Sequence, residues 1–92
     1  MSAHIENAVK LAARLYKARD AMRRLYGHDY PKKVAMFQEF IRAEMTKRKL
    51  DAINATMSLV AGLQKHDSGS GMTQALVLAA YVEMIEPSEA KS

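Results

Sequence analysis

Cysteine is absent from this sequence of 92 residues. Its absence excludes disulfides, thiolate metal sites and a cysteine nucleophile. The longest apolar run, residues 75–82, is far shorter than the ~20 residues that a membrane-spanning helix needs. The amino-terminal segment carries Glu6 and lacks the apolar block of a secretory signal. We therefore expect a cytoplasmic protein without a membrane segment.

Aromatic residues are also scarce, at 7% of the chain, although hydrophobic residues as a whole make up 49% and seven residues are methionine. This composition predicts a soft, mainly aliphatic core. A chain of this length has room for one domain. We expect that domain to span residues 1–86 and residues 87–92 to form a disordered tail.

Positive charge is concentrated in the first half of the chain. Residues 1–50 hold twelve lysines and arginines against five acids, a balance of +7, whereas residues 51–92 hold two against five, a balance of −3. Such an asymmetry indicates an anionic partner for the basic half. The alternative is that the basic side chains are simply solvated.

Two segments interrupt an otherwise helical pattern. Residues 27–31, Gly-His-Asp-Tyr-Pro, combine a helix stop with a proline suited to a first helical turn. Residues 67–71, Asp-Ser-Gly-Ser-Gly, form a second turn signal. The chain is therefore predicted to be all-α, with three helices at about 3–26, 31–64 and 72–86.

The predicted central helix changes its apolar face midway. Residues 34–41 place their apolar side chains on one side, and residues 50–60 place theirs on nearly the opposite side. The change falls at residues 46–49, where apolar residues are missing. Either the helix kinks there, or one continuous helix contacts two neighbours in succession. Because neither proline nor glycine is present at that point, we favour the continuous helix.

A continuous central helix predicts a flat arrangement in which each shorter helix covers its own half of the long one. The helix at 72–86 is apolar almost all round, so a flat layer would leave part of it uncovered. We therefore expect a homodimer, the alternative being a closed monomer with this helix in the middle. The expected self-association residues are Leu76, Val77, Ala80, Tyr81 and Met84.

Cations and tyrosines gather on the first predicted helix and around the first turn. Cations neutralise phosphates and tyrosine rings stack on bases, so this set indicates a nucleic acid or an acidic protein surface. A second basic run, at residues 47–49, would lie beside Lys10 and Arg14 if the first two helices formed an antiparallel hairpin. The alternative is that the tyrosines pack across the hairpin while the cations stay hydrated. The candidate partner-binding residues are Lys10, Arg14, Lys17, Arg19, Arg23, Arg24, Tyr26, Tyr30, Lys32, Lys33, Lys47, Arg48 and Lys49.

Catalytic and metal-binding patterns are weak. The pairs His28-Asp29 and His66-Asp67 resemble the adjacent His-Asp metal ligands of metal-dependent phosphohydrolases. The further His and Asp ligands of those enzymes are missing. Residues 67–73 could hold a phosphate at a helix start, although they lack the lysine of a phosphate-binding loop. We expect no catalytic residue, metal or cofactor.

Two functional hypotheses follow from these patterns. The first is a non-catalytic helical binding protein whose basic half engages nucleic acid or a protein complex that handles nucleic acid. The second is a small inhibitor or adaptor that binds a host protein through the apolar helix at 72–86. Phages and mobile elements encode short, cysteine-free helical proteins of this kind, and the similarity is one of size and style, without a shared motif.

Overall fold

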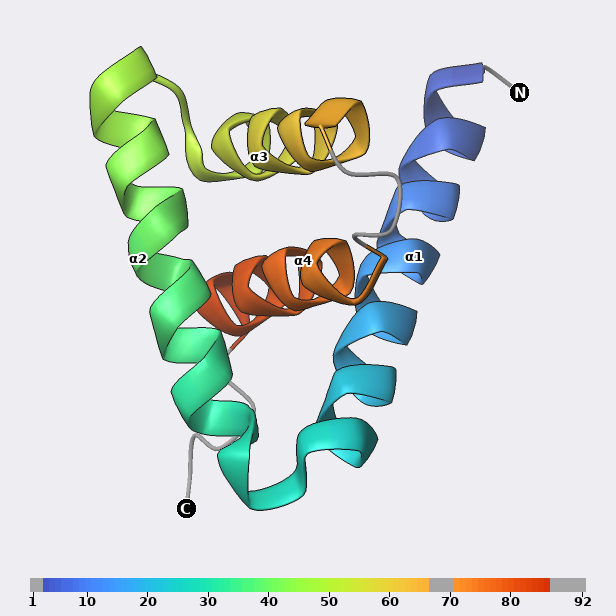
Figure 1. Cartoon of the computed structure of the whole chain (residues 1–92). Helices are drawn as coiled ribbons and strands as arrows, with labels where there is room; N and C mark the ends of the chain where they lie inside the picture. Colours follow the sequence, from blue (N-terminus) through green and yellow to red (C-terminus); the bar gives the residue numbers. More distant parts are fainter. Residues whose placement is uncertain (1–2, 67–70, 87–92) are drawn as a thin grey trace.

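The computed structural model describes residues 3–66 and 71–86 (Figure 1). These residues form four α-helices, α1 (Ala3–Tyr26), α2 (Tyr30–Arg48), α3 (Ala52–His66) and α4 (Gly71–Ile85), with a short 3₁₀ helix, Gly27–Asp29, between α1 and α2. The all-α prediction is confirmed, and so are the first and last predicted helices. The predicted tail, 87–92, and most of the predicted turn at 67–71 lie outside the described residues.

The prediction of one continuous helix over 31–64 is wrong, because the chain turns at residues 49–51. Lys49 adopts the left-handed conformation (φ 57°), and its N–H bonds the carbonyl of Met45, which closes α2. The Asp51 side chain then accepts the N–H of Asn54 at 2.9 Å and caps α3. The bend begins at Lys49, the last of the residues 46–49 where the apolar pattern changes face.

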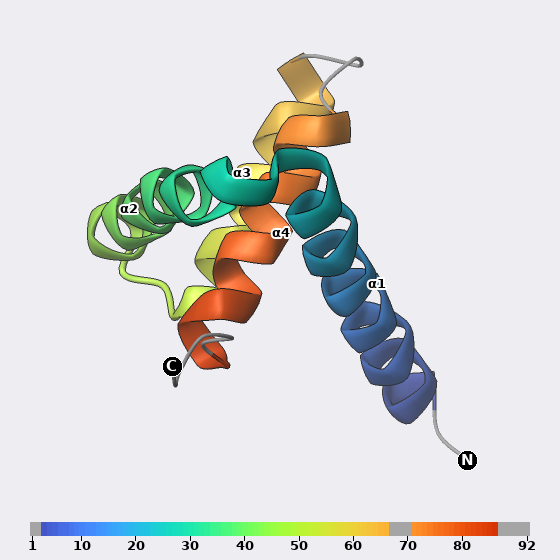
Figure 2. The same ribbon diagram turned by 90° about the horizontal axis from the view of Figure 1, so that it is seen from below.

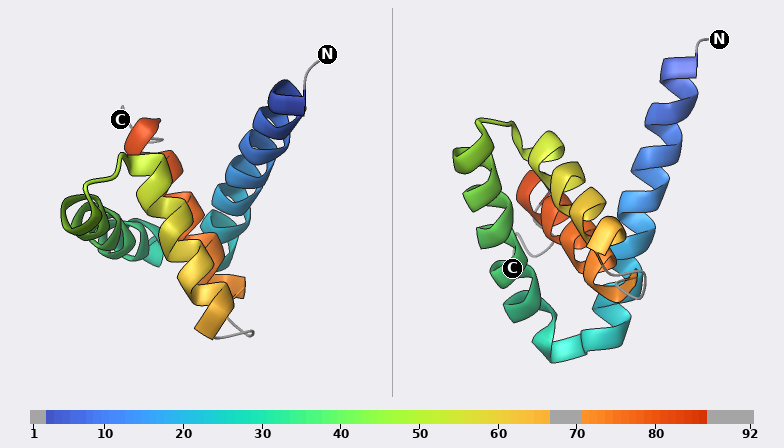
Figure 3. Two further views of the ribbon diagram at one scale, coloured as in Figure 1. Left: turned by 90° about the horizontal axis from the view of Figure 1, so that it is seen from above. Right: turned by 45° about the horizontal axis from the view of Figure 1, so that its top comes forward.

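Helix α4 lies at the centre of the molecule. It packs against α1, α2 and α3, and it runs antiparallel to α3 (Figures 1 and 3). Seen from below, α4 separates α2 from α1 (Figure 2). Leu76, Val77, Leu78, Ala79, Ala80 and Val82 are all buried. The flat arrangement predicted from the sequence is therefore wrong, and the closed alternative with this helix in the middle describes the fold.

The burial of α4 also corrects the predicted self-association surface. Leu76, Val77 and Ala80 are 5%, 2% and 0% exposed in a single chain, and Tyr81 and Met84 pack against the same core. Because the chain turns between α2 and α3, α3 folds back against α4 and covers it as a third neighbour beside α1 and α2. The apolar character of this helix therefore needs no second copy of the chain, and its inner face is not available to a host protein.

Helices α1 and α2 form a V rather than a tight hairpin. They meet at the 3₁₀ helix, where Gly27 takes a positive φ of 52°, and they diverge from there (Figures 1 and 3). Helix α4 occupies the space between their arms. Within the described residues, no helix combines the length and the apolar character needed to cross a bilayer.

Candidate anion-binding surface

Two of the predicted anion-binding arginines are instead partners of carboxylates on α4. Arg23 donates from Nη2 to Oε2 of Glu83 at 3.2 Å, and Arg19 reaches Oε1 of Glu86 from Nη1 at 3.5 Å. The guanidinium of Arg19 also lies over the ring of Tyr16, 5.0 Å from its centroid. These side chains join α1 to α4. Their positive charge is therefore partly neutralised by the carboxylates of Glu83 and Glu86.

Tyr30 is part of the same polar network and is not a free stacking surface. Its side chain is buried, and its hydroxyl donates to Oε2 of Glu83 at 2.8 Å. Burial, followed by this hydrogen bond, raises the pKa of Tyr30 well above its ordinary value. Glu83, whose side chain is only 9% exposed, therefore holds α4 against both α1 and the start of α2.

Tyr26 is half-buried at the end of α1. The ammonium of Lys33 lies 5.6 Å from its ring centroid, a cation–π distance. The tyrosines thus pack at the junction of α1 and α2, as the alternative in the sequence analysis had it. A base would have to displace Lys33 to stack on the ring face that it covers.

The basic run at residues 47–49 does not lie beside Lys10 and Arg14. The arms of the V separate the carboxyl end of α2 from the amino-terminal half of α1 (Figure 1). Arg48 pairs with Glu44 at 2.7 Å, and Glu44 also accepts a hydrogen bond from Ser58 at 2.8 Å. The predicted juxtaposition is wrong because it assumed a close antiparallel hairpin.

A stripe of cations on α1 remains exposed. Lys10, Arg14, Lys17 and Arg24 follow one another at spacings of four, three and seven residues, which places them on one face of the helix. In the described part of the chain, no carboxylate lies within ion-pair distance of any of them. We call these four residues the α1 stripe.

The middle of the α1 stripe borders a shallow groove between α1 and α4. Arg14 and Lys17 line it together with small side chains of α1 and the first residues of α4, from Gly71 onward. Because the amino-terminal end of a helix carries partial positive charge, α4 adds to the positive potential there. The groove measures about 240 Å³. The groove therefore has positive charge on both of its sides.

The candidate metal ligands of the chain are scattered in the part that the structure describes. Among the residues whose side chains are described, no three His, Asp or Glu side chains gather closely enough to hold a metal ion. His28 is exposed in the 3₁₀ helix. The side chains of His4 and His66, and the whole of Asp67, lie outside the described residues.

Two features of the structure were not predicted from the sequence. Glu83 and Glu86 were not identified as ion-pair partners, although acids in an apolar helix require cations, and Arg19 and Arg23 lie, as the two acids do, about one helical turn apart. Met36 and Phe40 belong to the apolar residues at 34–41 that were expected on one side of the helix, yet they are 44% and 49% exposed. The apolar residues at 34–41 span too wide an arc of α2 for one buried stripe, which could have shown this.

The comparisons with known proteins assign no relatives. No protein-family model matches the chain, and neither a curated protein nor a solved structure is significantly similar to it.

Proposed function

We propose that this protein is a non-catalytic binding protein that engages the phosphate backbone of nucleic acid through the α1 stripe. The observation that carries the proposal is the contrast between two sets of cations. Arg19, Arg23 and Arg48 are paired with carboxylates, whereas Lys10, Arg14, Lys17 and Arg24 are exposed and have no such partner among the described residues. A cytoplasmic location belongs to the same proposal.

The length of the α1 stripe suits a polyanion better than a small anion. From Lys10 to Arg24 the helix rises about 21 Å. Over that length, duplex DNA presents about twelve phosphates on its two strands. Several cations of the stripe can therefore contact phosphates at once, and each contact releases condensed counterions.

Backbone contact is favoured over base recognition because of the tyrosines. Tyr30 is buried and bonded to Glu83, and Tyr26 lies under Lys33. Stacking on bases, which the sequence suggested, would require these contacts to break. Phosphate contacts position a protein on nucleic acid without reading its sequence. We therefore propose binding with little sequence preference.

The experiment is a fluorescence anisotropy titration of labelled duplex DNA, and of the corresponding single strand, with the wild type and a charge-reversed variant. The variant carries Lys10→Glu, Arg14→Glu and Lys17→Glu. Each reversal replaces a surface ion pair of about 1 kcal/mol with repulsion. Affinity should therefore fall by about a hundredfold or more.

A second triple variant, Lys47→Glu, Lys49→Glu and Lys65→Glu, controls for net charge. Both variants change the formal net charge from +4 to −2, because each reversal removes two positive charges. The control should bind within a few-fold of the wild type, and circular dichroism should show all three proteins folded. Equal losses in the two variants, or no binding of either nucleic acid by the wild type at low salt, would overturn the proposal.

A further inference from the structure

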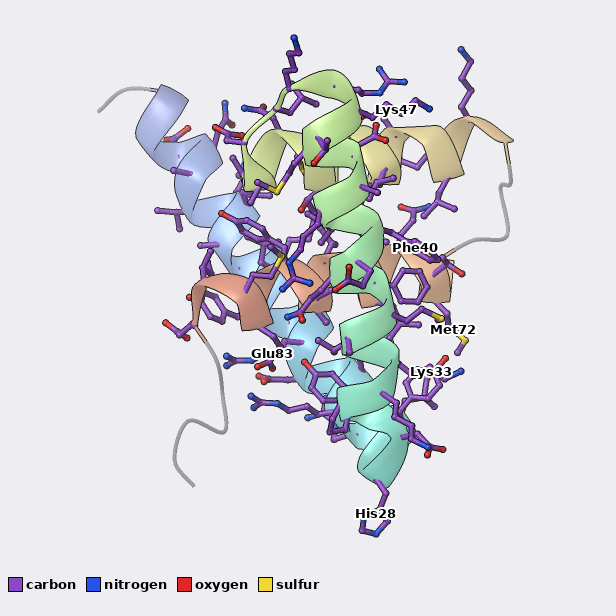
Figure 4. All side chains as sticks on the ribbon, turned by 90° about the vertical axis from the view of Figure 1, so that its left-hand side faces the viewer. His28, Lys33, Phe40, Lys47, Met72 and Glu83 are labelled. Atoms are coloured by element: carbon purple, nitrogen blue, oxygen red, sulfur yellow. The ribbon has the colours of Figure 1, made fainter. Side chains whose placement is uncertain are left out.

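Helix α2 carries an exposed apolar surface on the side turned away from Glu83. Met36 and Phe40, four residues apart, are 44% and 49% exposed. In Figure 4 the side chains of Lys33 and Phe40 lie on the same side of α2 as that of Met72 from α4, and opposite Glu83. Met72 is 53% exposed. We call this surface the α2 face. It consists of Met36, Phe40 and Met72 together with Lys32, Lys33 and Lys47.

The charge around the α2 face is mainly positive. Lys32 and Lys33 line a groove of about 330 Å³ with Met36, and Asp29 is the carboxylate that lines it with them. Lys47 lies two helical turns after Phe40, as Lys33 lies two turns before it. No carboxylate in the described ranges lies within ion-pair distance of these three lysines.

The two carboxylates within α2 near this face are paired with arginines. Glu39 is exposed but lies 2.6 Å from Arg42. Glu44 is only 13% exposed at its side chain, where it is held by Arg48 and Ser58. The α2 face therefore offers apolar side chains between two cationic ends. A complementary surface needs an apolar centre with acidic residues around it.

We propose that the α2 face docks an amphipathic helix of a partner protein whose apolar stripe is bordered by acidic residues. Exposed side chains four residues apart fit the apolar ridge of a helix laid against them. Methionine adapts its shape to different partners, which suits Met36 and Met72 to such a contact. This proposal is independent of the nucleic-acid contact proposed for the α1 stripe.

A second copy of the chain fits the α2 face less well because of its charges. In a two-fold, antiparallel pairing of α2 helices centred on Phe40, residues equally distant from Phe40 face each other. Lys33 of one copy would then meet Lys47 of the other at both ends. Like charges brought together in this way oppose association. An acidic partner removes the conflict.

The experiment follows methionine methyl groups by NMR in the full chain, labelled at the methionine ε-carbon. The probe is a synthetic helical peptide of about 18 residues, which matches the length of α2. It carries leucine on one face and glutamate on both borders of that face. The methyl signals of Met36 and Met72 should shift on titration, whereas that of buried Met22 should stay in place.

Two variants test the apolar contact between the α2 face and the peptide. Phe40→Gln should weaken peptide binding by about tenfold or more, because it removes a central apolar contact. Ile85→Gln, at a side chain of similar exposure on α4, should leave affinity within about twofold. Both variants should keep the nucleic-acid affinity of the wild type. Equal affinity of Phe40→Gln and wild type for the peptide would overturn the proposal.

A charge exchange tests the preference of the α2 face for a peptide with acidic borders. The double variant Lys32→Glu, Lys33→Glu should lose the acidic peptide and gain a peptide in which lysines replace the glutamates. Three results would refute the proposal: no shift of Met36 and Met72 with the acidic peptide, equal shifts with both peptides in the wild type, or shifts as large with a duplex oligonucleotide. A dimeric mass that Phe40→Gln converts to a monomer would assign the face to a second copy.

Discussion

Glu83 makes the most consequential polar contacts of the fold, and its replacement should measure what they contribute. The hydrogen bond from the buried Tyr30 hydroxyl to a carboxylate contributes about 1.5–3 kcal/mol. Arg23 is 35% exposed at its side chain, so its ion pair adds only about 0.5 kcal/mol. Glu83→Ala should therefore lower the free energy of unfolding by about 3 kcal/mol, a large share of the total for a domain of this size.

Urea denaturation of a double-mutant cycle isolates the contact between Tyr30 and Glu83. Glu83→Gln keeps the shape and an acceptor and should cost about 1 kcal/mol, and Tyr30→Phe should cost about 1–2 kcal/mol. The combined variant should lose less than the sum of the two, with a coupling energy of about 1 kcal/mol or more. Losses that add within about 0.5 kcal/mol would mean that the two side chains do not interact, and would refute the network.

Three further predictions concern the turn between α2 and α3 and the pH dependence of stability. In urea denaturation, Lys49→Gly should raise the free energy of unfolding by about 0.5–1 kcal/mol, because φ is positive there, whereas Lys47→Gly inside α2 should lower it by about 1 kcal/mol. Asp51→Ala should lower it by about 1 kcal/mol through loss of the α3 cap, whereas Asp29→Ala, which removes no capping hydrogen bond, should change it by a few tenths. Equal effects within either pair would contradict the assigned cap. Because the pKa of Tyr30 is raised above its usual 10.0, its contribution is complete below pH 10 and declines above it. The decline is by up to about 1.4 kcal/mol per pH unit. Tyr30→Phe should remove that part of the slope in denaturation series from pH 9 to 11.5, and an unchanged slope would contradict it.

The helical segments were predictable from the sequence because their signals are local. The apolar spacing of α1, the glycine and proline around residues 27–31 and the apolar character of α4 each act within one or two helical turns. The break at residues 49–51 was not predicted because it uses neither glycine nor proline. Lys49 takes a conformation that lysine adopts rarely, and the Asp51 cap accepts a backbone N–H, so residue 54 need not be of a particular type.

The arrangement of the helices depended on that break. A continuous helix over residues 31–64 would have covered α4 on one side only, and the expected homodimer followed from this. Once α3 folds back along α4, the same apolar residues are covered within one chain. The turn at the left-handed residue Lys49 thus accounts for the difference between the open layer that was predicted and the closed fold that is observed.

Part of the candidate site was also predictable from the sequence, because its signal is local. The α1 stripe could be derived from residue spacing alone, because all of its members lie on one helix. The pairing of Arg19 and Arg23 with α4 depends on contacts across 67 and 60 sequence positions. Which cations are neutralised inside the fold therefore became visible only when α4 was placed beside α1.

The salt dependence of nucleic-acid binding tests the central claim most directly. The logarithm of the binding constant for duplex DNA should fall linearly with the logarithm of the salt concentration. The slope should become shallower by about 2.7 in a Lys10→Gln, Arg14→Gln, Lys17→Gln variant, because three phosphate contacts are lost. A slope near zero in the wild type, or the same slope in the variant, would contradict a phosphate-binding role for the α1 stripe.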